Sequence, residues 1–178
     1  MSDTVQGILD SAERFIRRGG FHAFSFRQIA EEIGIKSASV HYYFPKKEDL
    51  GVAVVRRYGE AFLEALHEAA GPNAGSVTRL AAFTQVFRAN FEATGRICLC
   101  GVIGAEAQGV PDPVRAEVSA FMTACVAWLE ETSKMAGHTD PRTRAMTIMA
   151  ALEGAMMLAV NLEDAGVLDR VADDLLAL

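Results

Sequence analysis

The sequence lacks long apolar runs, an export signal and the alternation of β-strands, and each absence excludes a class of protein. No uninterrupted apolar stretch reaches the roughly 18 residues that a membrane-spanning helix needs, so we expect no membrane contact. The chain does not open on a basic segment followed by an apolar one, so we expect no secretion signal and a cytoplasmic location. Strict apolar-polar alternation is absent, which argues against a sheet.

Cysteine and enzyme signatures are also scarce. The three cysteines, Cys98, Cys100 and Cys125, are an odd number, which favours free thiols over a disulfide framework. Cys98-x-Cys100 has no nearby histidine and supplies only two of the four ligands of a closed zinc site. His67-Glu68 has no second histidine four residues on, as a zinc-protease helix requires. We therefore expect no metal, no cofactor and no enzymatic activity.

Helical periodicity, in contrast, is present almost throughout. Apolar residues recur every three or four positions, and glycine or proline stands at the breaks between these stretches. The composition, 51% hydrophobic and 22% charged, is that of a soluble globular protein. The sequence predicts an all-α fold of about nine helices. We expect them over about residues 5–18, 26–33, 37–44, 47–70, 76–94, 98–108, 113–136, 141–163 and 167–178.

Charge is unevenly distributed along the chain. The net charge is −6, yet residues 14–57 carry nine basic and four acidic side chains, a local balance of +5. From residue 58 onward, eight basic and sixteen acidic side chains give a balance of −8. A polyanion would be attracted to the first segment and repelled by the second, although an ordinary solvated helix surface would have the same composition.

Two short helices in the basic segment have the dimensions of a helix-turn-helix unit. Ser25 and Gln28 form a potential capping box at the start of the first, and Gly34-Ile35-Lys36 joins it to the second. We expect Ser37 to cap the second helix and Pro45 to follow its end. In such a unit the second helix enters the major groove of DNA while the first crosses the backbone. The alternative is a plain helical hairpin whose basic residues are incidental.

The outward side chains of the second helix are small or polar, which allows close approach to base edges and phosphates. Lys46 and Lys47 follow at the start of the next helix, where they could bind phosphate. The candidate DNA-binding residues are Arg27, Lys36, Ser37, Ser39, His41, Tyr42, Tyr43, Lys46 and Lys47.

The segment from Phe26 to Leu50, with its Ile29-Ala30 pair, Gly34, aromatic cluster ending at Phe44 and Lys47-Glu48-x-Leu50 run, resembles the N-terminal signature of TetR-type (tetracycline-repressor-like) regulators. The resemblance covers residues 5–58 and implies that Arg27 contacts the DNA backbone and Lys47 a phosphate. It also implies that the outward residues of the second helix face the groove. Ala38 and His41 depart from the glycine and tyrosine common in the family, so the operator cannot be inferred from a relative.

The resemblance also implies an organisation for the whole chain. A three-helix helix-turn-helix domain over 1–50 would precede an effector-binding and dimerisation domain over 51–178, with the fourth helix, from about residue 47, linking onward. The protein would be a homodimeric repressor that binds a palindromic double-stranded DNA operator and is released by a small apolar or amphipathic effector. Helices 113–136 and 141–163 would form the dimer interface, since small residues and methionines in the second permit close packing. A purely intrachain core is the alternative for these helices.

An apolar effector would need an apolar lining. The candidates are Phe62, Phe83, Phe87, Phe91, Cys98, Phe121, Met122, Cys125 and Trp128. Their helical spacing suits a filled core equally well. Two further hypotheses concern the whole chain: a thiol-based redox or electrophile sensor that uses Cys98 or Cys100, and a small all-α enzyme or binding domain.

Overall fold

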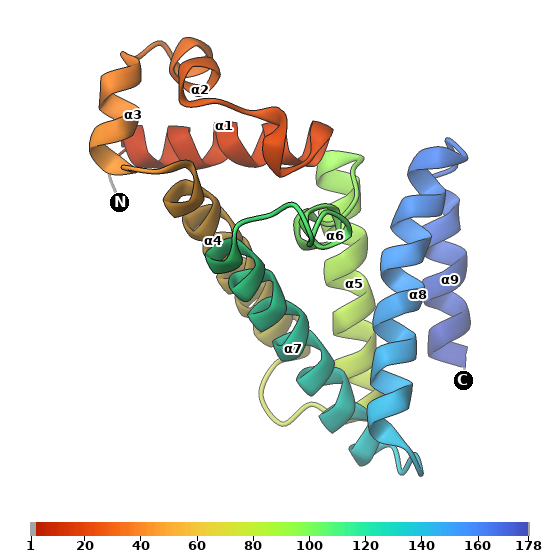
Figure 1. Ribbon diagram of the computed structural model, residues 1–178. Helices are drawn as coiled ribbons and strands as arrows, with labels where there is room; N and C mark the ends of the chain where they lie inside the picture. The colour runs from red at the N-terminus through yellow and green to blue at the C-terminus, as the bar shows by residue number, and fades with distance from the viewer. Residues whose placement is uncertain (1–2, 178) are drawn as a thin grey trace. The chain divides into compact units, whose positions relative to one another are not determined.

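In the computed structural model, which describes residues 3–177, every regular element is helical (Figure 1). The elements are α1 Asp3–Gly19, η1 Phe21–Ala23, α2 Phe26–Ile33, α3 Ser37–Tyr43, α4 Lys47–Ala70, α5 Ser76–Thr94, α6 Leu99–Ala105, α7 Asp112–Met135, α8 Pro141–Asn161 and α9 Gly166–Ala177. The predicted all-α fold and its nine α-helices are therefore confirmed over these residues. The short 3₁₀ helix η1 was not predicted.

One predicted helix cap and two predicted helix ends were wrong. Ser37 does not cap α3: it is the first helical residue, and Lys36 is the N-cap, without a side-chain hydrogen bond. α6 stops at Ala105 because the next residues form tighter turns, in which N–H groups bond to the carbonyl three residues earlier. α8 stops at Asn161, and Glu163 beyond it has a left-handed φ of 53°.

The backbone divides into two compact units, and α4 and α7 each contribute to both. The first unit runs to Gly59 and resumes over Leu99–Phe121. In it, α1 packs against α2, η1 and α6 around a core that includes Ile8, Ile16, Phe21, Ile29 and Leu50. A glycine is needed at position 51, since a Cβ there would lie 2.5 Å from Cε2 of Phe21 and 2.9 Å from Cγ2 of Val114.

The second unit comprises Glu60–Cys98 and Met122–Leu178. Its core includes Phe83, Phe87, Leu129 and Leu152, all buried, and α9 packs against α8 and α5. Arg88 on α5 pairs with two carboxylates of α9, at 3.0 Å from Asp169 and 2.5 Å from Asp173. These ion pairs fix α9 against α5.

α8 is the most apolar long helix of the second unit. By length and composition alone it could cross a membrane, but core helices of proteins that meet no membrane pass the same test. It buries Ile148, Leu152 and Met156, while Met157 and Leu158 are about half exposed, at 51% each. Both faces of α8 thus carry large apolar side chains.

Candidate DNA-binding site

The turn between α2 and α3 is built by local hydrogen bonds. The Ser25 hydroxyl accepts a hydrogen bond from the Gln28 backbone N–H and donates one to the Gln28 side-chain oxygen. The predicted capping box is therefore half formed, since the Gln28 side chain bonds to the hydroxyl and not to the Ser25 backbone. Gly34 ends α2 with a φ of 72°, a left-handed conformation that glycine adopts without strain, and its N–H bonds to the Ala30 carbonyl.

α3 is held by one apolar side and presents the rest of its surface outward. Val40 is fully buried and Phe44 follows it into the core. His41 and Tyr43 are exposed, and Tyr42 is 81% exposed. Ser37 and Ser39 are partly exposed, and Lys36 is exposed at the N-cap. Every predicted groove-facing residue is therefore accessible, as a helix that enters a DNA groove requires.

Lys47 is more constrained than a surface lysine. Its ammonium donates a hydrogen bond of 2.7 Å to the Phe24 carbonyl and lies 4.2 Å from the centre of the Phe24 ring. Partial burial lowers the pKa of Lys47. Its neighbour Lys46 points into solvent and pairs with Glu48, which raises the pKa of Lys46. The two adjacent lysines thus differ: the ammonium of Lys47 is partly buried and bonded to the backbone, and that of Lys46 is exposed and ion-paired.

Four of the nine candidate DNA-binding residues line one shallow groove. Arg27 from α2, Ser37 and His41 from α3, and Lys47 from α4 meet there, beside Phe24 and Pro45. The His41 ring packs edge-on against Phe26, 4.7 Å between centres. Lys36, Ser39, Tyr42, Tyr43 and Lys46 lie outside this groove. A concave surface lined by two cations and a hydroxyl suits a phosphate of the DNA backbone.

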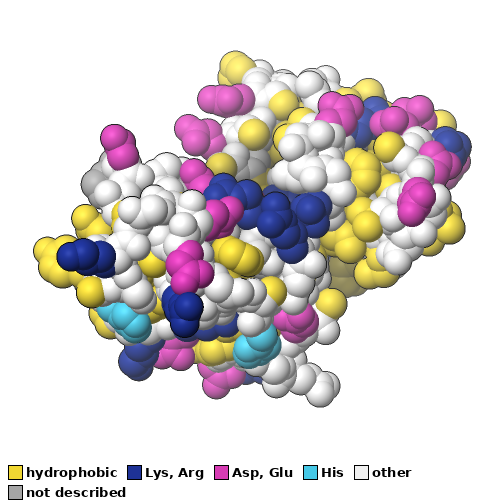
Figure 2. Space-filling view, turned by 90° about the horizontal axis from the view of Figure 1, so that it is seen from above, with side chains coloured by type: hydrophobic (Ala, Val, Ile, Leu, Met, Phe, Trp, Pro, Cys, Tyr) yellow, Lys and Arg dark blue, Asp and Glu magenta, His cyan; other side chains and the backbone are white. Residues whose placement is uncertain are grey.

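Several of the basic side chains in residues 14–57 form ion pairs within the molecule. Arg57 pairs with Asp10 and Glu13, Arg14 with Glu32, and Arg27 with Glu31. On the face seen in Figure 2, basic side chains accordingly lie among acidic ones. Position on the helix-turn-helix therefore defines the candidate site better than net charge does.

Two contacts that the sequence did not reveal join η1 to the segment after α6. The Phe21 backbone N–H donates to Oε2 of Glu106 at 2.8 Å, and the His22 ring donates to the Gly109 carbonyl at 2.9 Å. A side chain at Gly20 would collide with the same Glu106 carboxylate. No local pattern signals these contacts, because the partners lie more than 80 residues apart in the chain.

Four of the aromatic residues predicted to bind the effector are buried in the second unit. The ring centres of Phe62, Phe83 and Phe87 lie 5.3–5.9 Å from one another, and all three are buried, as is Phe91. Phe121 belongs to the first unit, where its ring packs against Tyr58. Met122 and Trp128 are partly exposed, and the Trp128 ring contacts both His67 and Arg79.

The three thiols are fully buried and none is in a disulfide. Burial, with Cys98 and Glu153 nearby, raises the pKa of Cys125. A reactive thiol needs a low pKa and access to solvent. Burial of Cys98 and Cys100 therefore gives no support to the redox-sensing hypothesis.

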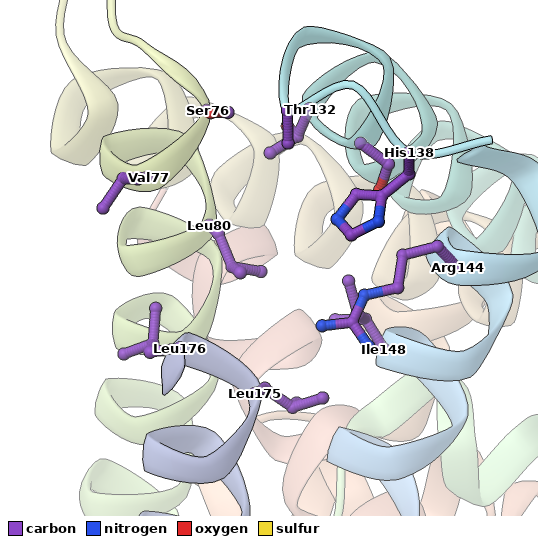
Figure 3. A pocket seen from close by; sticks show the side chains of 11 residues that line it. Ser76, Val77, Leu80, Thr132, His138, Arg144, Ile148, Leu175 and Leu176 are labelled. Atoms are coloured by element: carbon purple, nitrogen blue, oxygen red, sulfur yellow. The ribbon is translucent and has the colours of Figure 1, made fainter. Parts of the chain in front are cut away.

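A separate cavity of about 210 Å³ lies within the second unit, where α5 begins and α7 ends (Figure 3). Its walls come from α5, α7, α8 and α9 and include Leu80, Ile148 and Leu175. His138 and Arg144 point into the same space. None of the aromatic candidates lines it.

Models of known protein families match both parts of the chain. The model of bacterial regulatory proteins of the tetR family matches residues 8–54, and that of the C-terminal domain of LmrA/YxaF-like transcriptional regulators matches residues 76–174. The uncharacterized HTH-type transcriptional regulator YxaF of Bacillus subtilis is 22% identical over 167 residues, which are 91% of this chain and 87% of that protein.

Solved structures agree over nearly the full length. A TetR transcriptional regulator from Legionella pneumophila superposes with a TM-score of 0.91 at 28% identity, covering 98% of this chain and 96% of that one. A TetR-family regulator from Agrobacterium tumefaciens gives a TM-score of 0.90 at 27% identity, covering 97% and 95%.

Proposed function

The chain belongs to the TetR family of bacterial regulatory proteins, DNA-binding transcriptional regulators rather than enzymes, and from this premise we propose that it is an effector-released repressor. It binds a palindromic operator as a homodimer and works in the cytoplasm. The observation that supports this proposal best is α3, which is anchored by buried Val40 and turns Ser37, Ser39 and His41–Tyr43 away from the core.

Within this proposal, phosphate contacts and base contacts belong to different residues. Arg27 and Lys47 bind the phosphate backbone from the groove that they share. His41, Tyr42 and Tyr43 read base edges, because their side chains are exposed on α3. Two copies of α3 in one dimer would lie one turn of DNA apart, about 34–36 Å.

The dimer forms through α7 and α8. Met146, Met157, Leu158 and Val160 on α8 are all at least 39% exposed, and covering such an apolar surface favours association. A second copy of the chain is the occupant that fits, since a two-fold axis would bring identical apolar faces together.

Release requires that the effector favour one of two conformations. The contacts of Glu106 with the Phe21 N–H and of His22 with the Gly109 carbonyl connect the α6–α7 segment to η1. A displacement of that segment would therefore move η1 and the end of α1, and would change the spacing of the two α3 helices.

Fluorescence anisotropy with DNA from the protein's own promoter region tests this proposal. We expect tight binding to a palindromic site and weak, strongly salt-dependent binding to unrelated DNA. Lys47→Ala should weaken both and reduce the salt slope by about one unit. Lys46→Ala is the matched control and should have a smaller effect, because that ammonium is exposed outside the groove and paired with Glu48.

Replacing His41 separates specificity from affinity. His41→Tyr should change the preferred operator and leave binding to unrelated DNA within about twofold, because base contacts and not phosphate contacts are altered. Equal binding of the wild type to all DNA sequences would contradict the proposed function.

A further inference from the structure

We propose that the cavity of the second unit is the effector site and that it takes a small monocarboxylate with an alkyl chain. The proposal rests on the proposed effector response and assigns its ligand class. This cavity is separate from the cluster of Phe62, Phe83 and Phe87, whose buried rings pack against one another.

Arg144 and His138 would bind the carboxylate group of the ligand. Both side chains line the cavity and point toward its centre, one from α8 and one from the loop before it (Figure 3). Two other cations of the second unit are neutralised by ion pairs: Arg88 by Asp169 and Asp173, and Lys134 by Glu130. Arg144 has no such ion pair within residues 3–177, so its charge is available to a ligand. Arginine binds a carboxylate with two parallel hydrogen bonds.

The surroundings favour an anion over a cation. No aspartate or glutamate lines the cavity within the described part of the chain. The N-terminal end of α5, at Ser76, also opens on it, and the N-cap Gly75 offers no side chain to the first N–H groups of that helix. These groups add a partial positive charge at the same wall.

The other end of the cavity is apolar. Leu80 from α5, Ile148 from α8 and Leu175 from α9 form its walls, so an alkyl chain loses contact with water there. At about 210 Å³ the cavity is smaller than the clefts of about 300–1,000 Å³ that hold drug-sized ligands, so a short-chain carboxylic acid such as hexanoate suits it.

Isothermal titration calorimetry with sodium hexanoate tests the site on the full-length protein without DNA. We expect saturable binding, and at least about tenfold weaker binding of 1-hexanol and hexylamine, which lack the negative charge. Arg144→Gln should weaken hexanoate binding about tenfold or more, as loss of a charged hydrogen-bonding partner does.

Two further variants control for folding and location. Arg142→Gln removes a neighbouring arginine that is paired with Glu130 outside the cavity, and hexanoate binding should stay within about twofold. Ala136→Phe fills the rim from an exposed position of the lining and should abolish binding with circular dichroism unchanged. No saturable binding of hexanoate, equal binding of hexanol, or equal loss in both arginine variants would overturn the proposal.

Measurements of hexanoate binding and of promoter affinity on the same protein distinguish a failure of this inference from a failure of the proposed function. Hexanoate binding that depends on Arg144 but leaves promoter affinity unchanged would confirm the site and refute the effector response. Release of promoter DNA by other metabolites, with no hexanoate binding, would refute the site and leave the repressor proposal standing.

Discussion

The backbone N–H of Phe21 donates a 2.8 Å hydrogen bond to Oε2 of Glu106, which lies 85 residues later in the chain. The same carboxylate occupies the space beside Gly20 that any larger residue would need. One acidic side chain therefore fixes the turn that follows α1 and closes the first unit across a long stretch of sequence.

Removing this carboxylate should loosen the first unit. We expect Glu106→Ala to lower the free energy of unfolding by about 1–2 kcal/mol, because a half-buried N–H loses its charged acceptor. Urea unfolding followed by circular dichroism measures the change. Glu68→Ala, at an exposed position of α4, is the control and should shift stability by less than about 0.5 kcal/mol. Similar effects of both variants would show that the Glu106 contact contributes little.

Gly51 and Gly7 provide a matched pair of substitutions inside helices. Gly51→Ala places a Cβ against Phe21 and Val114 and should destabilise the protein by about 1–3 kcal/mol. At Gly7 the new methyl would meet only Ile33, at an ordinary 3.8 Å, so Gly7→Ala should stabilise by about 0.5–1 kcal/mol. Thermal unfolding of the two variants measures both changes in stability. A Gly51→Ala protein as stable as the wild type would contradict the close packing described for α4.

Glu32 should make the first unit sensitive to acid. The hydrogen bond from the buried Ser11 hydroxyl, followed by the interaction with Arg14, lowers the pKa of Glu32. The folded-state pKa lies below the unfolded one, so the contribution to stability is complete above the ordinary glutamate pKa, about 4.5. It is lost as pH falls through the lowered folded value.

Comparison of wild type with Glu32→Gln tests this sign. The wild type should be more stable by about 1 kcal/mol or less at pH 7, since Glu32 is partly exposed, and the difference should shrink toward zero near pH 3. A difference that grows on acidification would refute the assignment.

The proposed dimer interface can be tested at one residue of α8. Leu158→Glu puts a charge on a half-exposed apolar position and should convert the dimer to monomer at micromolar concentration, as measured by light scattering after size exclusion. Val77→Glu makes the same change at an exposed valine of α5, outside the proposed interface, and should leave the dimer intact. A monomeric wild type would exclude the interface altogether.

Local signals in the sequence predicted the helices well. Gly34, Pro45 and the Gly71–Gly75 break act on their immediate neighbours, so α2 and α4 were predicted at their observed ends. The N-cap of α3 was wrong by one residue because Ser37 can either cap a helix or begin one. All predicted groove-facing side chains are accessible, which follows from helical periodicity once Val40 is recognised as the anchor.

Contacts between distant segments could not be predicted. The bond from Lys47 to the Phe24 carbonyl and that from Phe21 to Glu106 depend on how helices cross, and a single sequence has no periodic signal for crossing. Aromatic spacing likewise cannot distinguish a packed core from a cavity, so the sequence left both alternatives open for the effector-binding candidates. Arg144 and His138 lie in unremarkable surroundings in the sequence and become notable only when folding brings them together.

The outward exposure of Tyr42 has a consequence for how such a regulator changes over evolution. Tyr42 is 81% exposed, and its ring contacts that of its neighbour Tyr43. Val40 is the residue of α3 that is buried in the core. Mutations at the exposed positions of α3 therefore cost little stability, while Lys47 and Gly51 are tied to the fold. A descendant could acquire a new target gene through a few changes in one short helix and inherit the remainder of the molecule unaltered.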